Sequence, residues 1–243
     1  MPTVRYGEPL NVVVVAKGHP YLRDPFMAMF DEMEGIACTL VEQPAAARLM
    51  SVANLDGIDA LVLYDMPGLD FRAPSPPAYV EPEAAFKQNF LALLDRGIGI
   101  VALHHAIAGW PAWEEYAQLL GGRFLYRPGK LRGVERPDSG YRHDVEHEIT
   151  AADPGHAILQ GIEFPLRLTD ELYLSEVFEG DVQPLLRSNH KFIRDEFYSA
   201  SLAVSGHMFS NEGWSHADGS KLVGWTKRES TRPLVYLTNG AGT

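Results

Sequence analysis

Residues 96–122, RGIGIVALHHAIAGWPAWEEYAQLLGG, contain the pattern that decides the fold. The apolar run at 98–103 has the length of a buried strand, and apolar residues at helical spacing follow it. Two adjacent histidines, His104 and His105, stand between the two segments. The stretch therefore predicts a buried strand that delivers two imidazoles to a strand-to-helix turn.

Alternating strand and helix patterns lead up to this stretch. The β-branched run NVVVVAK at 11–17 is continuous, which is typical of a strand covered on both faces of a sheet. Further strands are expected at 36–42, 59–65 and 98–103, and helices at 24–35, 44–55, 82–97 and 110–122. Short joins between such elements predict an α/β fold with a doubly wound, mainly parallel sheet and helices on both faces.

The second half of the chain predicts strands without clear helices between them. In YRHDVEHEIT, residues 141–150, alternation places His143, Val145, His147 and Ile149 on one side of a strand. Strand-like segments recur at 182–188, 199–209, 221–227 and 232–238. Because no linker separates the halves, we expect a β-rich C-terminal extension of the same sheet and one domain over residues 1–243.

Composition argues against several classes of protein. The formal net charge is −11, and no cluster of Lys or Arg is longer than a pair, so neither a nucleic acid nor a membrane surface is an expected partner. Cys38 is the only cysteine, which leaves no disulfide framework and no cysteine-based zinc site. The sequence has no nucleotide-binding motif, signal peptide or apolar run of transmembrane length, and we expect a cytoplasmic protein.

The ends of the expected strands carry polar residues that suit a ligand site. Ligands of open α/β sheets bind beyond the carboxyl ends of the strands. His19 follows the first strand, Asp65 ends the third, and His104 and His105 follow the fourth. An imidazole at a helix N-terminus tends to stay neutral, which suits a base or a metal ligand. The alternatives are that His19 and Asp65 are turn residues, or that His19 and His104 hold a divalent metal.

Several motifs resemble those of the trehalose-utilisation (ThuA-like) family. They are GIGIVALHHAIAGWPAWEEYAQLLGGRF at 97–124, DALVLYDMPG at 59–68, ITAADPGHAILQGI at 149–162, LTDELYL at 168–174 and LVGWTKRESTRPLVYLTNG at 222–240. The resemblance spans almost the whole chain. It implies a flavodoxin-like fold related to the class I glutamine amidotransferases.

The resemblance also implies what the protein does not do. In the amidotransferases a nucleophilic cysteine occupies the sharp turn after a strand, and this sequence has His104 or its neighbour there. The replacement removes the thiolate that glutamine hydrolysis needs, so we expect no glutaminase activity. Many ThuA-like proteins carry a Gly-His pair after the last strand, where this chain has Asn239-Gly240-Ala241-Gly242.

Carbohydrate catabolism is the function that the resemblance implies, with trehalose, another disaccharide or a keto-sugar as the small-molecule partner. We predict acid–base chemistry, with His104 as the base and Glu171 as its partner acid or orienting group. Further residues of the motifs and strand ends are candidates for substrate binding: His19, Asp65, His105, Trp110, Asp170, Tyr173 and His207.

Alternatives remain at this stage. Asp170 and Glu171 either point to opposite sides of a strand, or Thr169 and Asp170 begin a helix. The missing cysteine is also compatible with a non-catalytic sugar-binding or regulatory protein, and the strand-end histidines with a metal-dependent hydrolase. His156 is expected to brace a loop, and a homodimer is the default assembly for such a fold.

Overall fold

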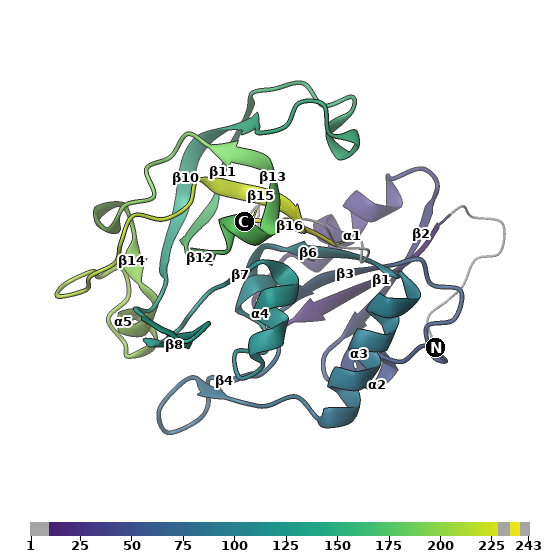
Figure 1. Ribbon diagram of the computed structural model, residues 1–243, viewed down its shortest axis with the longest axis horizontal. Helices are drawn as coiled ribbons and strands as arrows, with labels where there is room; N and C mark the ends of the chain where they lie inside the picture. The colour runs from purple at the N-terminus through teal and green to yellow at the C-terminus, as the bar shows by residue number, and fades with distance from the viewer. Residues whose placement is uncertain (1–9, 228–233, 239–243) are drawn as a thin grey trace.

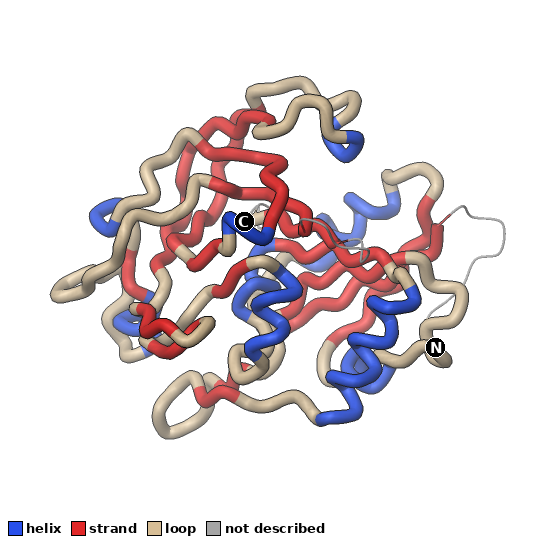
Figure 2. Tube along the Cα trace, viewed as in Figure 1, coloured by secondary structure: helices blue, strands red, loops and turns tan. Residues whose placement is uncertain are grey.

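The computed structural model describes residues 10–227 and 234–238. One ten-stranded sheet runs through the molecule, with short two-stranded ribbons beside it (Figure 1, Figure 2). The strands are β1 (Leu10–Lys17), β2 (Ile36–Glu42), β3 (Ala60–Asp65), β4 (Leu69–Asp70), β5 (Ala78–Tyr79), β6 (Gly99–Leu103), β7 (Gly122–Arg123), β8 (Gly129–Leu131), β9 (Val134–Arg136), β10 (Gly140–Ala151), β11 (Leu166–Leu174), β12 (Glu176–Val177), β13 (Val182–Ser188), β14 (Tyr198–Ser199), β15 (Leu222–Lys227) and β16 (Leu234–Leu237). The α-helices are α1 (Arg23–Asp31), α2 (Ala45–Leu49), α3 (Ala84–Arg96), α4 (Glu114–Leu120) and α5 (Ala200–Val204). Among the described residues, none of the helices has the length and apolar character needed to span a bilayer.

The parallel half of the sheet has the strand order β16-β6-β3-β1-β2. Residues 12–16 of β1 are all buried, as a strand covered on both faces requires. Phe30 of α1 lies in the same core cluster as Val14, and Phe90 of α3 lies with Val13 in the cluster on the other face. The flavodoxin-like arrangement with helices on both faces is therefore confirmed.

The antiparallel half continues the sheet in the order β11-β10-β13-β15, with β14 paired to β10. Strand β16 joins the halves because it pairs antiparallel with β15 and parallel with β6. The antiparallel strands have their own core cluster, which includes Leu172, Leu174, Phe197 and Val223. In Figure 1 they lie on the opposite side of β16 from the purple strands β1 and β2. The predicted β-rich extension of one sheet is confirmed.

Two helices are shorter than the sequence predicts. The helix expected at 44–55 is limited to α2, because Met50 leaves the helical backbone with a ψ of 86°. The helix expected at 110–122 begins only at Glu114, because Trp110 has a φ of 45°, which a right-handed helix does not contain. Between β6 and Trp110 the chain forms a short 3-10 helix, His104–Ala108.

The strand predicted at 199–209 is wrong, because α5 occupies residues 200–204 and turns follow it. The Ser199 hydroxyl accepts a hydrogen bond from the backbone N–H of Leu202, which is the contact of a helix N-cap. The Asp138 carboxylate accepts from the Ser199 hydroxyl and from the backbone N–H of Ser201. These contacts start a helical turn that the alternation of residue types does not reveal.

A β-bulge interrupts β10 between Arg142 and Val145. Asp144 has a φ of 54°, and His143 and Asp144 together oppose the single residue Glu171 of β11. The extra residue brings the His143 ring to Glu171 rather than to the face of Val145. The prediction that His143 shares a face with Val145 is therefore wrong.

Candidate functional site

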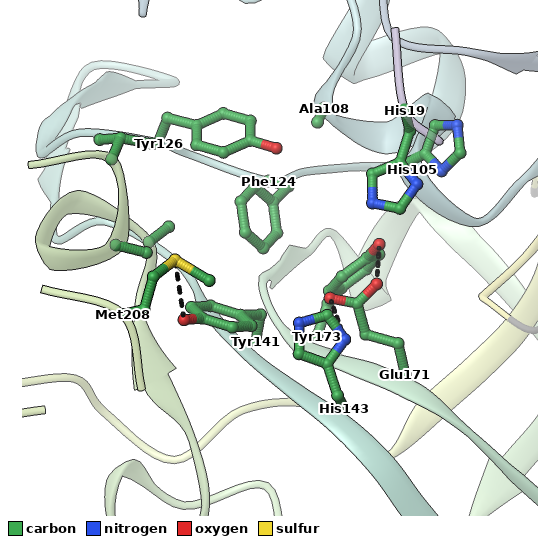
Figure 3. Close-up of a pocket in the computed structure, with 13 residues that line it drawn as sticks. His19, His105, Ala108, Phe124, Tyr126, Tyr141, His143, Glu171, Tyr173 and Met208 are labelled. Atoms are coloured by element: carbon green, nitrogen blue, oxygen red, sulfur yellow. Dashed lines mark hydrogen bonds and ion pairs between the residues drawn. The ribbon is translucent and has the colours of Figure 1, made fainter. Parts of the chain in front are cut away.

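Side chains from both halves of the sheet converge beyond the carboxyl ends of the parallel strands. The ring centroids of His19 and His104 lie 6.3 Å apart, and those of His104 and His105 lie 5.3 Å apart. Figure 3 shows Glu171, His143 and Tyr173 below the rings of His19 and His105. The parallel half supplies His19, His104 and His105, and the antiparallel half supplies His143, Glu171 and Tyr173.

The backbone at His104 is held in an uncommon conformation by the last strand. His104 has a φ of 48°, which costs a non-glycine residue about 1–3 kcal/mol and is a feature of functional turns. Its Nδ1 donates to the carbonyl oxygen of Thr238 at 2.7 Å, and the Tyr236 hydroxyl donates to the His104 carbonyl oxygen at 2.8 Å. The Thr238 carbonyl thus places a proton on Nδ1 and leaves Nε2 to face the other partners.

His104, Glu171 and Tyr173 form a closed hydrogen-bonded triangle. The His104 Nε2 lies 3.1 Å from Glu171 Oε2 and 2.9 Å from the Tyr173 hydroxyl, which is itself 3.0 Å from Oε2. When Nε2 is unprotonated, it accepts from Tyr173. When Nε2 is protonated, both His104 and Tyr173 donate to Glu171. The triangle can therefore take up or release one proton without moving a heavy atom.

Glu171 is the acidic group of the triangle, and two opposed effects act on it. Burial raises the pKa of the Glu171 carboxyl, but the hydrogen bond and charge of His104, together with the charge of His143, outweigh burial. The pKa is lower than usual as a result, so the carboxylate is ionised at neutral pH. Its second oxygen, Oε1, lies 3.6 Å from His143 Nδ1.

His19 and His105 are stacked, with centroids 4.6 Å apart and an angle of 27° between their planes. Only 2% of His105 is exposed, and burial, with smaller contributions from the charges of His104 and His19, lowers its pKa to about 2. Burial also lowers the pKa of His19. Both rings are therefore neutral imidazoles near pH 7.

Two adjoining cavities open at Glu171. The aromatic cavity, of about 200 Å³, is lined by His19, His105, Ala108, Phe124, Tyr126, Tyr141, His143, Glu171, Tyr173, Ala200, Ala203, Val204 and Met208 (Figure 3). The outer cavity, of about 500 Å³, is lined by His19, Pro20, Tyr21, Leu22, Tyr64, His143, Asp144, Thr169, Asp170 and Glu171. His19, His143 and Glu171 contact both spaces. His104 is fully buried behind Glu171 and Tyr173 and lines neither.

Most of the predicted site residues are brought together. Asp170 lies in the wall of the outer cavity, and its Oδ1 accepts from the backbone N–H of Glu171. The two acids lie on β11, so the alternative of a helix beginning at Thr169 is wrong. Both acids line the outer cavity. His156 accepts the backbone N–H of Ile158 through Nδ1, which confirms its role in a loop.

Trp110 and His207 are not brought to the cluster. The Trp110 ring packs 4.9 Å from Phe86 of α3 and against Gly68, because its positive φ turns the side chain into the helical layer. His207 is exposed beyond α5, and its neighbour Met208 reaches the aromatic cavity instead. The prediction that Trp110 and His207 belong to the substrate-binding site is therefore corrected.

Asp65 ends β3 as predicted but lines neither cavity. Its Oδ2 accepts from Gln43 Nε2 at 2.7 Å, and burial raises the pKa of its carboxyl to about 7. These contacts support the alternative in which Asp65 has a structural role and does not bind the substrate.

The sequence reasoning missed several cavity residues. His143 was hidden by the bulge, whose left-handed Asp144 has no specific sequence signal. Tyr126 and Tyr141 lie in the aromatic cavity, and the Tyr126 hydroxyl donates only to Met66 Sδ at 3.3 Å, a weak acceptor. The aromatic cluster FLY at 124–126, which follows a Gly-Gly pair and Arg123, was the available signal for Tyr126.

The suggested metal pair, His19 and His104, does not extend to a larger ligand set. Within residues 10–227 and 234–238, no three His, Cys, Asp or Glu side chains are arranged to hold a metal ion. The stretch 239–242, where the family resemblance led us to note the lack of a Gly-His pair, lies outside the described residues.

Comparison with known proteins agrees with the sequence motifs. A family model described as ThuA, trehalose utilisation, matches residues 11–216. No curated protein matches the chain in sequence. A ThuA-like protein from Parabacteroides merdae superimposes with a TM-score of 0.62 and 14% identity, covering 97% of this chain and 81% of that one.

Two further structures align over most of the chain. A ThuA-like protein from Bacteroides uniformis gives a TM-score of 0.60 and 12% identity, covering 99% of this chain and 85% of that one. PurLQS from Thermotoga maritima gives a TM-score of 0.48 and 14% identity, covering 95% and 86%.

Proposed function

The chain belongs to the trehalose-utilisation (ThuA) family, and from this premise we propose that it catalyses proton transfer on a carbohydrate that carries a carbonyl group. The observation that carries the proposal is the triangle of His104, Glu171 and Tyr173 at the wall of two cavities. A buried carboxylate with one oxygen tied to the protein and the other near open space has the geometry of a general base.

Glu171 is the group that meets the substrate in this proposal. It lines both cavities, whereas His104 is fully buried behind it. Oε1 of Glu171 removes the proton from the carbon next to the carbonyl, and the electron pair of the broken C–H bond forms an enolate. His104 holds Oε2 in place and keeps the carboxyl ionised, so it acts as a positioning residue rather than as the base.

The negative charge that develops on the enolate oxygen needs a donor. Tyr126 supports this role, because its hydroxyl lies in the aromatic cavity and donates only to a thioether. Figure 3 shows this hydroxyl directed across the cavity toward the side of Ala108. A tyrosine hydroxyl stabilises an enolate best in such a water-poor space.

The enolate has two fates. Return of the proton from Glu171 to the former carbonyl carbon, with the hydroxyl hydrogen on the deprotonated carbon passing to the enolate oxygen, gives an isomer of the keto-sugar. Departure of an oxygen substituent from the carbon beyond the enolate gives elimination, and the leaving oxygen takes a proton from His143 or from water. His143 and His19 line both cavities and are the candidate second proton carriers.

Glutamine hydrolysis has no support in this site. Cys38 is the only cysteine of the sequence, and it lies on β2, while His104 stands in the turn after β6. Without a thiolate at that turn, the covalent amidotransferase route has no nucleophile.

The decisive experiment is hydrogen exchange. 3-Keto-trehalose or 3-keto-glucose is incubated with the protein in D₂O, and proton NMR records loss of the hydrogen next to the carbonyl. Glu171→Gln is expected to slow exchange by about 10²-fold or more. Glu148→Gln, which alters an exposed carboxylate paired with Arg167 on the neighbouring strand, is the matched control. No exchange above background, or equal rates for Glu171→Gln and wild type, would contradict the proposal. Saturable binding without exchange would identify a non-catalytic sugar-binding protein instead.

A further inference from the structure

The imidazole of His19 presents a hydrogen-bond acceptor at the cavity walls. His19 is half-buried and lines both the aromatic and the outer cavity. Its Nδ1 lies 2.9 Å from the carbonyl oxygen of Pro20, which can only accept a hydrogen bond, so Nδ1 donates. Burial lowers the pKa of His19, and the ring is neutral near pH 7. Nε2 of the neutral ring therefore carries a lone pair and no hydrogen.

Nε2 of His19 is also accessible from the cavities. In the described part of the chain no protein group makes a hydrogen bond to it. The histidine nitrogens that lack a partner and are enclosed by protein atoms are Nδ1 of His105 and Nε2 of His147, His190 and His216. Nε2 of His19 is not one of these enclosed atoms, so a ligand in the cavities can reach it.

The ring of His19 is held in place near the proposed base. It stacks on His105, with centroids 4.6 Å apart, and meets the edge of His104 at 6.3 Å. The charge of Glu171 raises the pKa of His19 against the larger effect of burial, which shows that the two groups are close. In Figure 3 the His19 ring and the Tyr126 hydroxyl approach the aromatic cavity from opposite sides, and Glu171 lies below the ring. A fixed acceptor, a fixed base and a fixed donor therefore surround one space.

We infer that His19 is a specificity-determining residue whose Nε2 accepts a hydrogen bond from the hydroxyl group on the carbon that Glu171 deprotonates. The inference rests on the proposed function, since it names a contact of the same site. The substrate is then an α-hydroxy ketone, with its carbonyl oxygen at Tyr126 and the neighbouring hydroxyl at His19. The reverse orientation is unfavourable, because a carbonyl oxygen would face the lone pair of Nε2.

This contact also narrows the fates of the enolate. Isomerisation requires a hydroxyl on the deprotonated carbon, and the group that His19 binds is that hydroxyl. A neutral His19 has no hydrogen on Nε2 to give. In an elimination, the leaving oxygen would therefore take its proton from His143 or from water. His19 selects and orients the α-hydroxy ketone and does not act as an acid.

The first test observes the ring directly. In protein labelled with ¹⁵N-histidine, the imidazole resonances report which nitrogen carries the hydrogen, and the resonances missing from His19→Phe identify those of His19. We expect Nδ1 to be protonated and Nε2 to be bare at pH 7. Saturating 3-keto-glucose is expected to shift the Nε2 resonance, because its lone pair gains a hydrogen bond. A ring protonated at Nε2, or an Nε2 resonance that the sugar does not move, overturns the inference.

The second test compares 3-keto-glucose with its 2-deoxy and 4-deoxy derivatives, each of which lacks the hydroxyl on one carbon next to the carbonyl. Proton NMR of the exchange reaction shows which of these carbons loses its hydrogen. Loss of the hydroxyl on that carbon is expected to lower kcat/KM for exchange about tenfold or more in wild type. In His19→Phe, which keeps an aromatic ring beside His105, this additional loss is expected to disappear. The intrinsic acidity of the C–H bond enters both comparisons equally, so the four rates isolate the contact.

The outcomes separate this inference from the proposed function. Equal discrimination in His19→Phe and wild type, or an unmoved Nε2 resonance, overturns the role of His19. If exchange on 3-keto-glucose persists in those cases, the proposed function stands alone. If the sugar moves the resonance and one deoxy derivative binds about tenfold more weakly, but no exchange occurs, the contact stands and the catalytic proposal falls. If His19→Phe does not fold, the resonance and the wild-type series decide.

Discussion

The two halves of the sheet contribute to the site in different ways. The parallel half presents His19, His104 and His105 at strand ends, where the chain turns. The antiparallel half presents Glu171 and Tyr173 from within β11 and His143 from a bulge in β10.

The two halves also hold their side chains differently. At the strand ends, backbone carbonyls of Thr238 and Tyr64 hold His104 and His105, which makes their orientation a property of the sheet. On the antiparallel side, the carboxylate and ring atoms themselves face the cavities. The parallel half therefore acts as the rigid wall, and the antiparallel half supplies the group that we propose to react.

The largest expected effect concerns the cores of the two halves. Leu61 of β3 and Leu172 of β11 are both fully buried, so Leu61→Ala and Leu172→Ala should each lower the free energy of unfolding by about 2–5 kcal/mol. Because one sheet joins the halves, each variant should shift a single cooperative transition in urea, followed by circular dichroism. A second transition that moves only in Leu172→Ala would show two independent units.

The buried carboxyl groups of the two halves should respond oppositely to amide substitution. Burial raises the pKa of Asp65 to about 7, above that of an unfolded chain, so the folded state binds the proton more tightly. This stability is fully present below about pH 4 and is lost as the pH rises through 7. Asp65→Asn, which keeps an acceptor for Gln43, should be about 2–4 kcal/mol more stable than wild type at pH 8 and similar to it near pH 4.

Asp138 is the matched group in the antiparallel half, where Ser199 and Ser201 donate to its carboxylate. Asp138→Asn should lower the free energy of unfolding by about 1–2 kcal/mol at pH 8. Urea titrations of both variants at pH 4, 6 and 8 check the pair. If both substitutions raise, or both lower, the free energy of unfolding at pH 8, the predicted contrast between the two carboxyl groups is wrong.

His104 and His143 both lower the pKa of Glu171, and replacing them should have effects of different size. His104→Asn keeps a residue that tolerates the left-handed backbone but displaces the carboxylate, and we expect kcat/KM on a keto-sugar to fall about 10²-fold. Loss of the His104 hydrogen bond and charge raises the pKa of Glu171, so the acid limb of the pH profile should move to higher pH.

His143→Asn should move this limb in the same direction but less, because the His143 charge contributes less to the Glu171 pKa. Steady-state rates from pH 4 to pH 9 make the comparison. A larger shift from His143→Asn would reverse the assignment of the main partner.

The smallest expected effect concerns the bulge. Asp144 has a φ of 54°, which glycine adopts freely and a β-branched residue resists. Asp144→Val should lower the free energy of unfolding by about 1–2 kcal/mol, whereas Asp144→Gly should change it by less than about 0.5 kcal/mol. Equal losses in the two variants would mean that the carboxylate, and not the backbone, matters at this position.

The parallel half could be predicted from sequence because its signals are local. A continuous apolar strand such as β1 and the strand-end rule were enough to place His19 and His104 in one site. The sequence-based predictions failed where a single backbone torsion angle, or a partner distant in the sequence, determines the structure. The positive φ of Trp110 keeps a predicted helix from beginning there, and that of Asp144 turns His143 toward Glu171. Partners distant in sequence, such as Thr238 for His104, leave no mark on the local pattern.

The position of β16 has a consequence for biosynthesis. This strand lies between β15 and β6, and its end supplies the carbonyl that holds His104, across a sequence separation of 134 residues. While a ribosome is still adding residues before 234, β6 lacks one neighbour and Nδ1 of His104 lacks the carbonyl oxygen that accepts its hydrogen bond. Non-local pairing of this kind is slow and comes late. A nascent chain therefore gains its complete site only after residues 234–238 have been made, so a product terminated before them carries all of the reactive side chains but not their arrangement.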